Sequence, residues 1–227
     1  MKKRLISILL LCCMVLTLLP TTVLAADGPM DTIPKYDVSI DVYNRTSDIS
    51  IKDSRSYYIY SSVPDKLRDT WAWDKKIFIK GDKTAPHVFI DGVNIKMSPS
   101  SKGPAIELNK KASAYLYFIG KDSTLQGADG RAAIQKNRSE GQLYVLARTG
   151  TTVTCKGGHR AAGIGGSYAT RNISNGYYNG DMYGHGVNMH FGSRSNPDYW
   201  GGIIAAIGGN GGAGIGGGQG GSGEKLY

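Results

Sequence analysis

Tyrosine and tryptophan side chains are concentrated in one stretch of the sequence, between Ser167 and Trp200. The stretch is also rich in asparagine and glycine. Aromatic ring faces beside polar amides suit sugar rings, which offer apolar C–H faces and hydroxyl edges. We therefore select five candidate carbohydrate-binding residues: Tyr177, Tyr178, Tyr183, Tyr199 and Trp200. The alternative is a loop whose tyrosines pack back on the rest of the protein. Trp71 and Trp73 are a weaker candidate pair, for which packing is the favoured interpretation.

The acidic residues bear on whether the chain is an enzyme. A calcium-dependent polysaccharide lyase needs carboxylates that converge on one ion. From residue 82 onward the acidic residues are scattered, with no Asp-x-Asp or Asp-Asp pair: Asp82, Asp91, Glu107, Asp122, Asp129, Glu140, Asp181, Asp198 and Glu224. Asp129 and Arg131 are a possible acid–base couple, although a salt bridge in a turn is the favoured interpretation. We predict no catalytic residue and keep a lyase as an alternative.

From the histidines and the cysteines we predict no metal site, and we expect no cofactor. The four histidines lack zinc-finger or zincin spacing, and Cys155 is isolated in the sequence. The formal charge is +9, but no basic run extends beyond Lys110-Lys111, so we expect no nucleic-acid partner. A moderate positive charge favours adhesion to anionic polymers.

The elements that must position these residues come from an internal repeat. In four short strings a small residue is followed by isoleucine, and in the last two strings glycines follow the isoleucine. The strings lie at 103–106, 130–134, 159–166 and 211–218. Their isoleucines, Ile106, Ile134, Ile164 and Ile215, are 28, 30 and 51 residues apart. Between them lie runs of four to six β-branched, aromatic or apolar residues separated by Gly, Asp, Asn or Ser, which is typical of strands and turns.

This pattern predicts an all-β right-handed parallel β-helix with about 28–30 residues per coil. A solenoid must place the same small-plus-branched step at the same corner of every coil, whereas an antiparallel sandwich, the alternative, has no reason to repeat it. The four isoleucines should therefore point into one interior. The glycines beside them should permit tight turns where the backbones of neighbouring coils approach closely.

The ordered series Ile90-Asp91-Gly92-Val93-Asn94-Ile95, 132–136 (Ala-Ala-Ile-Gln-Lys) and 162–166 (Ala-Gly-Ile-Gly-Gly) resembles a known group. It is similar to secreted and surface carbohydrate-binding-domain proteins of anaerobic Gram-positive bacteria, whose fold is similar to the pectate-lyase β-helix. The resemblance covers about 49–218. It implies an extracellular, non-enzymatic module that binds a polysaccharide or a cell-surface glycan, as an adhesin does. A structural surface repeat without a ligand is the alternative.

The N-terminus has the pattern of an export signal. Lys2, Lys3 and Arg4 precede an apolar stretch from Leu5 to Leu19, and Ala25 ends a small-residue cleavage site. This stretch is short for a membrane span, which needs about 20 residues. We therefore predict a signal peptide at 1–25, a secreted or cell-surface protein, and no membrane span after cleavage. Removal of 1–25 lowers the formal charge from +9 to +6.

The remaining boundaries follow from the repeat. We expect an N-terminal linker at 26–48, the β-helix domain at 49–215 with an insert at about 167–200, and a loose Gly-rich tail at 216–227. The chain ends soon after a turn string that elsewhere precedes new strands. The sequence therefore predicts a β-helix that is incomplete at the C-terminus: the chain is either a fragment, or its open last coil pairs with a partner.

Overall fold

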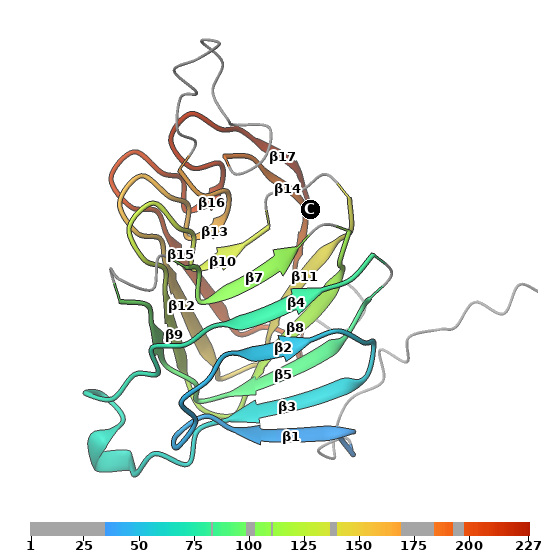
Figure 1. Cartoon of the computed structure of the whole chain (residues 1–227), viewed down its shortest axis with the longest axis vertical. Helices are drawn as coiled ribbons and strands as arrows, with labels where there is room; N and C mark the ends of the chain where they lie inside the picture. The colour runs from blue at the N-terminus through green and yellow to red at the C-terminus, as the bar shows by residue number, and fades with distance from the viewer. Residues whose placement is uncertain are drawn as a thin grey trace, which may run out of the picture. The chain divides into compact units, whose positions relative to one another are not determined.

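The chain forms three parallel β-sheets in a computed structural model that describes residues 35–82, 84–98, 103–109, 111–136, 140–168, 184–192 and 198–227 (Figure 1). Sheet A comprises β1 (Val38–Asp41), β3 (Ser56–Tyr60), β5 (His87–Asp91), β8 (Ala114–Ile119), β11 (Leu143–Ala147), β14 (Gly186–Phe191) and β17 (Gly223–Leu226). Sheet B comprises β2 (Ile49–Ile51), β4 (Ile77–Lys80), β7 (Ile106–Asn109), β10 (Ile134–Gln135), β13 (Ile164–Gly165) and β16 (Ile215–Gly216). Sheet C comprises β6 (Ile95–Lys96), β9 (Ser123–Gln126), β12 (Thr152–Lys156) and β15 (Ile203–Ile207).

The order of the strands along the chain has a fixed rotation. From β5 onward the chain visits sheets A, C and B in turn, and each strand pairs in parallel with the corresponding strand of the preceding and following rounds. Every strand pairing among the described residues is parallel. The antiparallel sandwich is therefore wrong, and the arrangement is consistent with the expected parallel β-helix. One 3-10 turn, η1 (Asp65–Leu67), interrupts the strands.

A continuous row of isoleucines runs through sheet B. Pairing in register places these six residues side by side on successive strands: Ile49, Ile77, Ile106, Ile134, Ile164 and Ile215. The first five are at most 2% exposed and belong to one core with inward residues of sheets A and C. The shared interior is thus confirmed for Ile106, Ile134 and Ile164. Ile215 keeps the register but is 36% exposed, because no described strand covers that side of β16.

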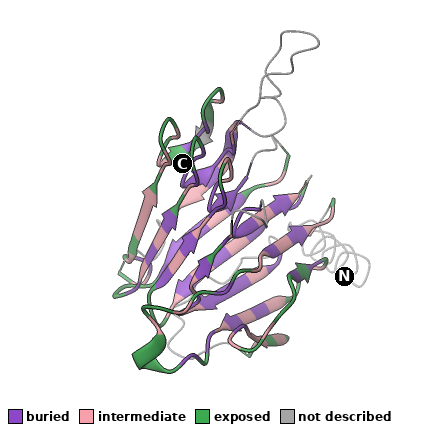
Figure 2. Ribbon diagram, turned by 60° about the vertical axis from the view of Figure 1, so that its left-hand side comes forward, coloured by how far each residue is buried: buried purple, intermediate pink, exposed green. Residues whose placement is uncertain are grey.

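Alternation along the strands produces this core. Inward residues are buried and their neighbours partly exposed, as in β8, where Ala114, Leu116 and Phe118 are buried and Tyr115 and Tyr117 are not (Figure 2). A parallel sheet with one outer face open to solvent needs this period of two. Cys155 lies inward on β12 between Leu125 and Ala206, and its burial raises the pKa of the thiol.

Three predicted boundaries need correction, because strands lie in segments that were expected to be irregular. β1 falls inside the expected linker at 26–48 and pairs with β3. β14 falls inside the expected insert at 167–200, where Val187 and Met189 are buried and the strand pairs with β11 and β17. β17 lies in the expected loose tail at 216–227. The expected signal peptide at 1–25 lies outside the described residues.

Candidate functional site

The five candidate binding residues are only partly described. Tyr177, Tyr178 and Tyr183 lie outside the described residues, and Tyr199 and Trp200 pack on the outer face of sheet A. The Trp200 ring lies 5.2 Å from that of Tyr117 and is 8% exposed. Tyr199 meets Trp200 edge to face at 4.7 Å, and the Arg148 guanidinium lies 5.1 Å above the Tyr199 ring. The packing interpretation therefore describes Trp200, while glycan binding by the stretch stays a prediction.

Sheet A carries a ladder of stacked rings on its outer face. Neighbouring centroids are 4.4–4.8 Å apart, and the planes are within 14° of parallel, along the row His87, Tyr115, Tyr144, His190 and Tyr227. A second row contains Tyr58, Phe89 and Tyr117, and Tyr36 stacks on Tyr58 at 4.7 Å. Burial raises the pKa of Tyr36 to about 12. Because the faces of the inner rings lie against one another, only ring edges remain for a ligand, and the ladder is better suited to stabilising the sheet than to stacking sugars.

The ladder makes stability depend on pH through His87. Burial lowers the pKa of His87 below its ordinary value, and its Nδ1 lies 3.0 Å from the Tyr117 hydroxyl. The unfolded chain therefore takes up this proton at a higher pH than the folded chain, so the free energy of unfolding should fall as the pH drops below about 6.5. Burial lowers the pKa of His190 as well, which adds to the same slope.

The variant His87→Phe tests this dependence, because phenylalanine keeps a stacked ring and removes the titrating group. We expect chemical denaturation between about pH 7 and pH 5 to show a shallower loss of stability than in the wild type. Carboxylates with lowered pKa, such as Asp53, act at more acidic pH and leave this window unchanged. An unaltered slope would contradict the assignment to His87.

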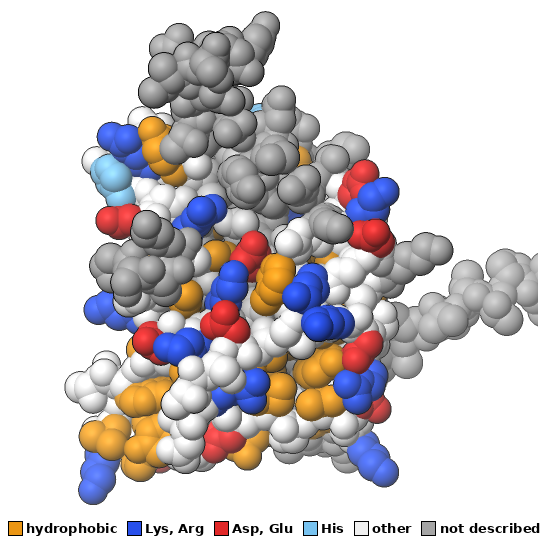
Figure 3. Space-filling view, in the orientation of Figure 1, with side chains coloured by type: hydrophobic (Ala, Val, Ile, Leu, Met, Phe, Trp, Pro, Cys, Tyr) orange, Lys and Arg blue, Asp and Glu red, His pale blue; other side chains and the backbone are white. Residues whose placement is uncertain are grey.

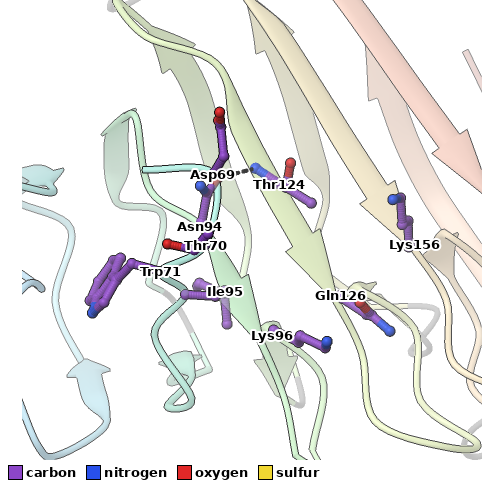
Figure 4. Close-up of a pocket in the computed structure, with 10 residues that line it drawn as sticks. Asp69, Thr70, Trp71, Asn94, Ile95, Lys96, Thr124, Gln126 and Lys156 are labelled. Atoms are coloured by element: carbon purple, nitrogen blue, oxygen red, sulfur yellow. Dashed lines mark hydrogen bonds between the residues drawn. The ribbon is translucent and has the colours of Figure 1, made fainter. Parts of the chain in front are cut away.

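The outer face of sheet C holds a groove of about 360 Å³ (Figure 4). Its floor comes from outward side chains of three neighbouring strands: Lys96 on β6, Thr124 and Gln126 on β9, and Lys156 on β12. The register places Lys96, Gln126 and Lys156 in one row across the strands. Their inward neighbours Ile95, Leu125 and Cys155 are buried, so the alternation that fills the core also fixes the polar floor.

One wall of the groove is the segment Asp69–Ala72, which follows η1. In Figure 4, Trp71 stands at one side of the groove and Lys156 at the other. The Trp71 ring meets Tyr43 edge to face at 5.4 Å. Trp73, by contrast, is 3% exposed and donates from Nε1 to the carbonyl oxygen of Arg45 at 2.7 Å. The favoured packing interpretation is thus confirmed for Trp73, and Trp71 also packs against the core while it lines the groove.

Several hydrogen bonds hold this wall against the sheet. Asn94 Nδ2 donates to the carbonyl oxygen of Arg68 at 3.0 Å, and Asn94 Oδ1 accepts from the Thr124 backbone at 2.9 Å. Arg68 Nη1 donates to the carbonyl oxygen of Gly92 at 2.9 Å. Lys121 Nζ lies 2.7 Å from Asp65, at the start of η1. These bonds preorganise the groove, which reduces the entropy lost on binding.

The groove offers hydrogen-bonding groups and one aromatic ring. Thr124, Gln126, Lys96 and Lys156 bring a hydroxyl, an amide and two ammonium groups to the lining, and Trp71 brings an aromatic side chain. Asp69 adds a carboxylate at the rim. A ring face with several donors and acceptors suits a ligand that has both apolar C–H faces and hydroxyl groups.

Sequence reasoning did not identify this groove. Trp71 was noted, but Lys96, Thr124, Gln126 and Lys156 lie far from it along the chain. The available signal was the repeat itself, since Lys96, Gln126 and Lys156 recur at one constant interval. Such a spacing places the residues in one row across neighbouring strands.

The carboxylates of the described residues are spread over the protein. Glu107 pairs with Lys76 at 2.7 Å and Glu140 with Lys111 at 2.9 Å, while Asp122 accepts from the Thr152 backbone. The described residues contain no group of three or more His, Cys, Asp or Glu that could hold a metal ion. On the face shown in Figure 3, basic and acidic side chains are interspersed.

In the described part of the chain, no helix has the length and apolar character that a membrane crossing requires. Comparisons with protein-family models, with curated proteins and with solved structures find no match to this chain.

Proposed function

We propose that this chain is a secreted, non-enzymatic polysaccharide-binding module that uses the groove on sheet C. The observation that carries the proposal is the juxtaposition of Trp71 with a preorganised row of hydrogen-bonding side chains. In this proposal residues 1–25 direct export, and the partner is an extracellular or cell-surface polysaccharide. The +6 charge after cleavage favours contact with anionic surfaces.

The three sheets, in this proposal, form a right-handed parallel β-helix. The recurring order A, C, B and the nearly constant chain interval along the isoleucine row up to Ile164 support it. Crossovers between parallel strands are right-handed in almost all known proteins. The scattered carboxylates favour binding over a lyase, and the occupied ring faces of sheet A favour the groove over the ladder.

The replacement Trp71→Ala tests the site. We expect retention of the chain on insoluble polysaccharides to weaken roughly fivefold, because one sugar–indole contact contributes about 1 kcal/mol. Gln126→Ala, in the floor of the groove, should also weaken retention, and its outward side chain makes the fold independent of it. The thermal midpoint of each variant is measured alongside.

The matched control is Tyr199→Ala, which removes an aromatic ring from sheet A. We expect it to retain the polysaccharide as the wild type does. Loss of retention in Tyr199→Ala with full retention in Trp71→Ala would move the site to the stretch 167–200. If no polysaccharide retains the wild type, a structural surface repeat without a ligand replaces the proposal, and an unsaturated product from pectin with calcium would indicate a lyase.

A further inference from the structure

We infer that the groove on sheet C binds an acidic polysaccharide, whose acidic groups on every second sugar are held by Lys96 and Lys156. This ligand class rests on the proposed function, because it specifies what the same groove binds. Both lysines are exposed and line the groove. They belong to the row across β6, β9 and β12, and Gln126 lies between them. The row therefore presents a cation, a neutral amide and a second cation in that order.

The register of the strands sets the separation of the two lysines. Lys96 pairs with Gln126 and Gln126 pairs with Lys156, so the outer Cα atoms are two strand spacings apart, about 9.6 Å. An extended polysaccharide advances by a similar length with each disaccharide. Acidic groups on alternate sugars therefore recur at the interval of the lysines, and the flexible lysine stems can absorb a small mismatch.

The charges of the row are available to a ligand. Lys76, Lys111 and Lys121 each have a carboxylate oxygen within 2.9 Å. Lys96 and Lys156 form no salt bridge in the described part of the chain. The strands β6, β9 and β12 contain neither Asp nor Glu. Two charges separated by more than the Debye length, about 8 Å at physiological salt, repel each other little, so each lysine can attract its own anion.

The order of the lining residues suits a chain that lies across the strands. Figure 4 shows Trp71, Lys96, Gln126 and Lys156 following one another in that direction. A polysaccharide along this line would meet an aromatic side chain first and the two ammonium groups further on. The Gln126 amide can hydrogen-bond the hydroxyl groups of the sugar between the two acidic ones.

A single-stranded nucleic acid is the other polymer that combines negative charge with flat rings. Proteins that bind it place successive aromatic side chains under successive bases. Among the described residues that line the groove, Trp71 is the one aromatic side chain. The groove therefore favours a polysaccharide, which needs one ring contact and several hydrogen bonds.

Asp69 gives the charge preference a test of opposite sign. It is the one carboxylate among the described lining residues, and it is exposed. A carboxylate at the rim repels an acidic ligand and has little effect on a neutral one. We expect Asp69→Asn to bind an acidic polysaccharide roughly twofold more tightly and a neutral one as the wild type does.

The main test is the affinity of the full chain for hyaluronan and for its methyl ester, measured by isothermal titration calorimetry. Hyaluronan has a carboxylate on every second sugar, and the ester keeps the polymer and removes the charge. We expect Lys96→Gln and Lys156→Gln each to weaken hyaluronan binding roughly threefold, and the double variant roughly tenfold. The wild type should bind the ester roughly tenfold more weakly than hyaluronan, and neither lysine variant should change that affinity.

Two controls separate the position of the charge from its amount. Lys52→Gln removes an exposed lysine that follows β2 of sheet B, and it should bind hyaluronan as the wild type does. Gln126→Lys combined with Lys156→Gln keeps the net charge but moves one cation to a single strand spacing from Lys96. We expect this variant to bind hyaluronan as weakly as Lys156→Gln alone. Circular dichroism and the thermal midpoint of each variant check that the fold is kept.

Four outcomes would overturn the inference. Equal affinity for hyaluronan and its ester, with both weakened by Trp71→Ala, would exclude an acidic ligand and leave the proposed function standing. Wild-type affinity in the variant with the moved charge would exclude the spacing. An equal loss in Lys52→Gln would mean that net charge alone attracts the polymer. Failure of the wild type to bind hyaluronan would also overturn it, and retention on insoluble polysaccharides would then decide the proposed function separately.

Discussion

Replacing Ile134 by alanine is expected to lower the free energy of unfolding by about 2–5 kcal/mol. Ile134 is fully buried in the isoleucine row, between Ile106 on β7 and Ile164 on β13. The strands on both sides fix the backbone, so the cavity left by the missing atoms closes only in part. Chemical denaturation monitored by circular dichroism measures the change.

The matched control is Ile215→Ala, in the same row on β16. Ile215 is 36% exposed, so less apolar surface returns to water when the side chain is shortened. We expect its effect to be less than half that of Ile134→Ala. A change below about 0.5 kcal/mol at Ile134 is typical of a surface position and would contradict its place in the core.

The isoleucine row also explains why the sequence was sufficient to predict the parallel sheets. In this fold one strand contacts the next at a nearly constant chain interval, so Ile106, Ile134 and Ile164 recur with the spacing of the structural repeat. Each isoleucine occupies the same corner of its round, so the structural requirement appears in the sequence as a short recurring string. Gly163 and Gly165, which flank Ile164, make it more specific, since a Cβ atom at either position would lie within 2.8 Å of backbone.

β14 could not be predicted from the sequence, because the constant interval of the repeat is interrupted before it. In sheet A, Leu143 follows its partner Ala114 by one ordinary round of the chain, whereas Met189 follows its partner Leu143 after a much longer interval. The sequence of β14, Gly-Val-Asn-Met-His-Phe, resembles neither of the preceding sheet A strands. Its inward residues Val187 and Met189 fill the same space with different shapes, which the core tolerates if the volume is conserved.

The groove on sheet C could not be predicted for a different reason. Its floor follows the repeat, but its wall is a single segment after η1 that occurs once in the chain. That wall is positioned by Asn94 and Arg68, whose hydrogen bonds join residues 24 to 26 positions apart. The ring ladder of sheet A is similar, because His87, Tyr115 and Tyr144 form a row only once the register of β5, β8 and β11 is known.

Replacing Gly158 by alanine should destabilise the protein by about 3 kcal/mol or more, at the upper end of the range for overpacking. Gly158 follows β12, and its backbone N–H donates to the carbonyl oxygen of Arg131 at 2.9 Å. A Cβ atom there would lie 1.9 Å from the carbonyl oxygen of Ala128 in the preceding round, and 2.5 Å from its carbon. Because both contacts are with backbone atoms, the turns that follow β9 and β12 must separate to admit the methyl group.

Gly150→Ala is the control, because it introduces backbone strain without a steric contact. Gly150 has φ +85°, which alanine adopts at a cost of about 1–2 kcal/mol, but a Cβ atom there meets no heavy atom within 4 Å. Thermal and chemical denaturation of the two variants should therefore differ by at least about 1 kcal/mol, with Gly158→Ala the less stable. Equal losses would mean that the contact at Gly158 costs no more than the backbone conformation at Gly150, and the close approach of successive rounds after β12 would then be wrong.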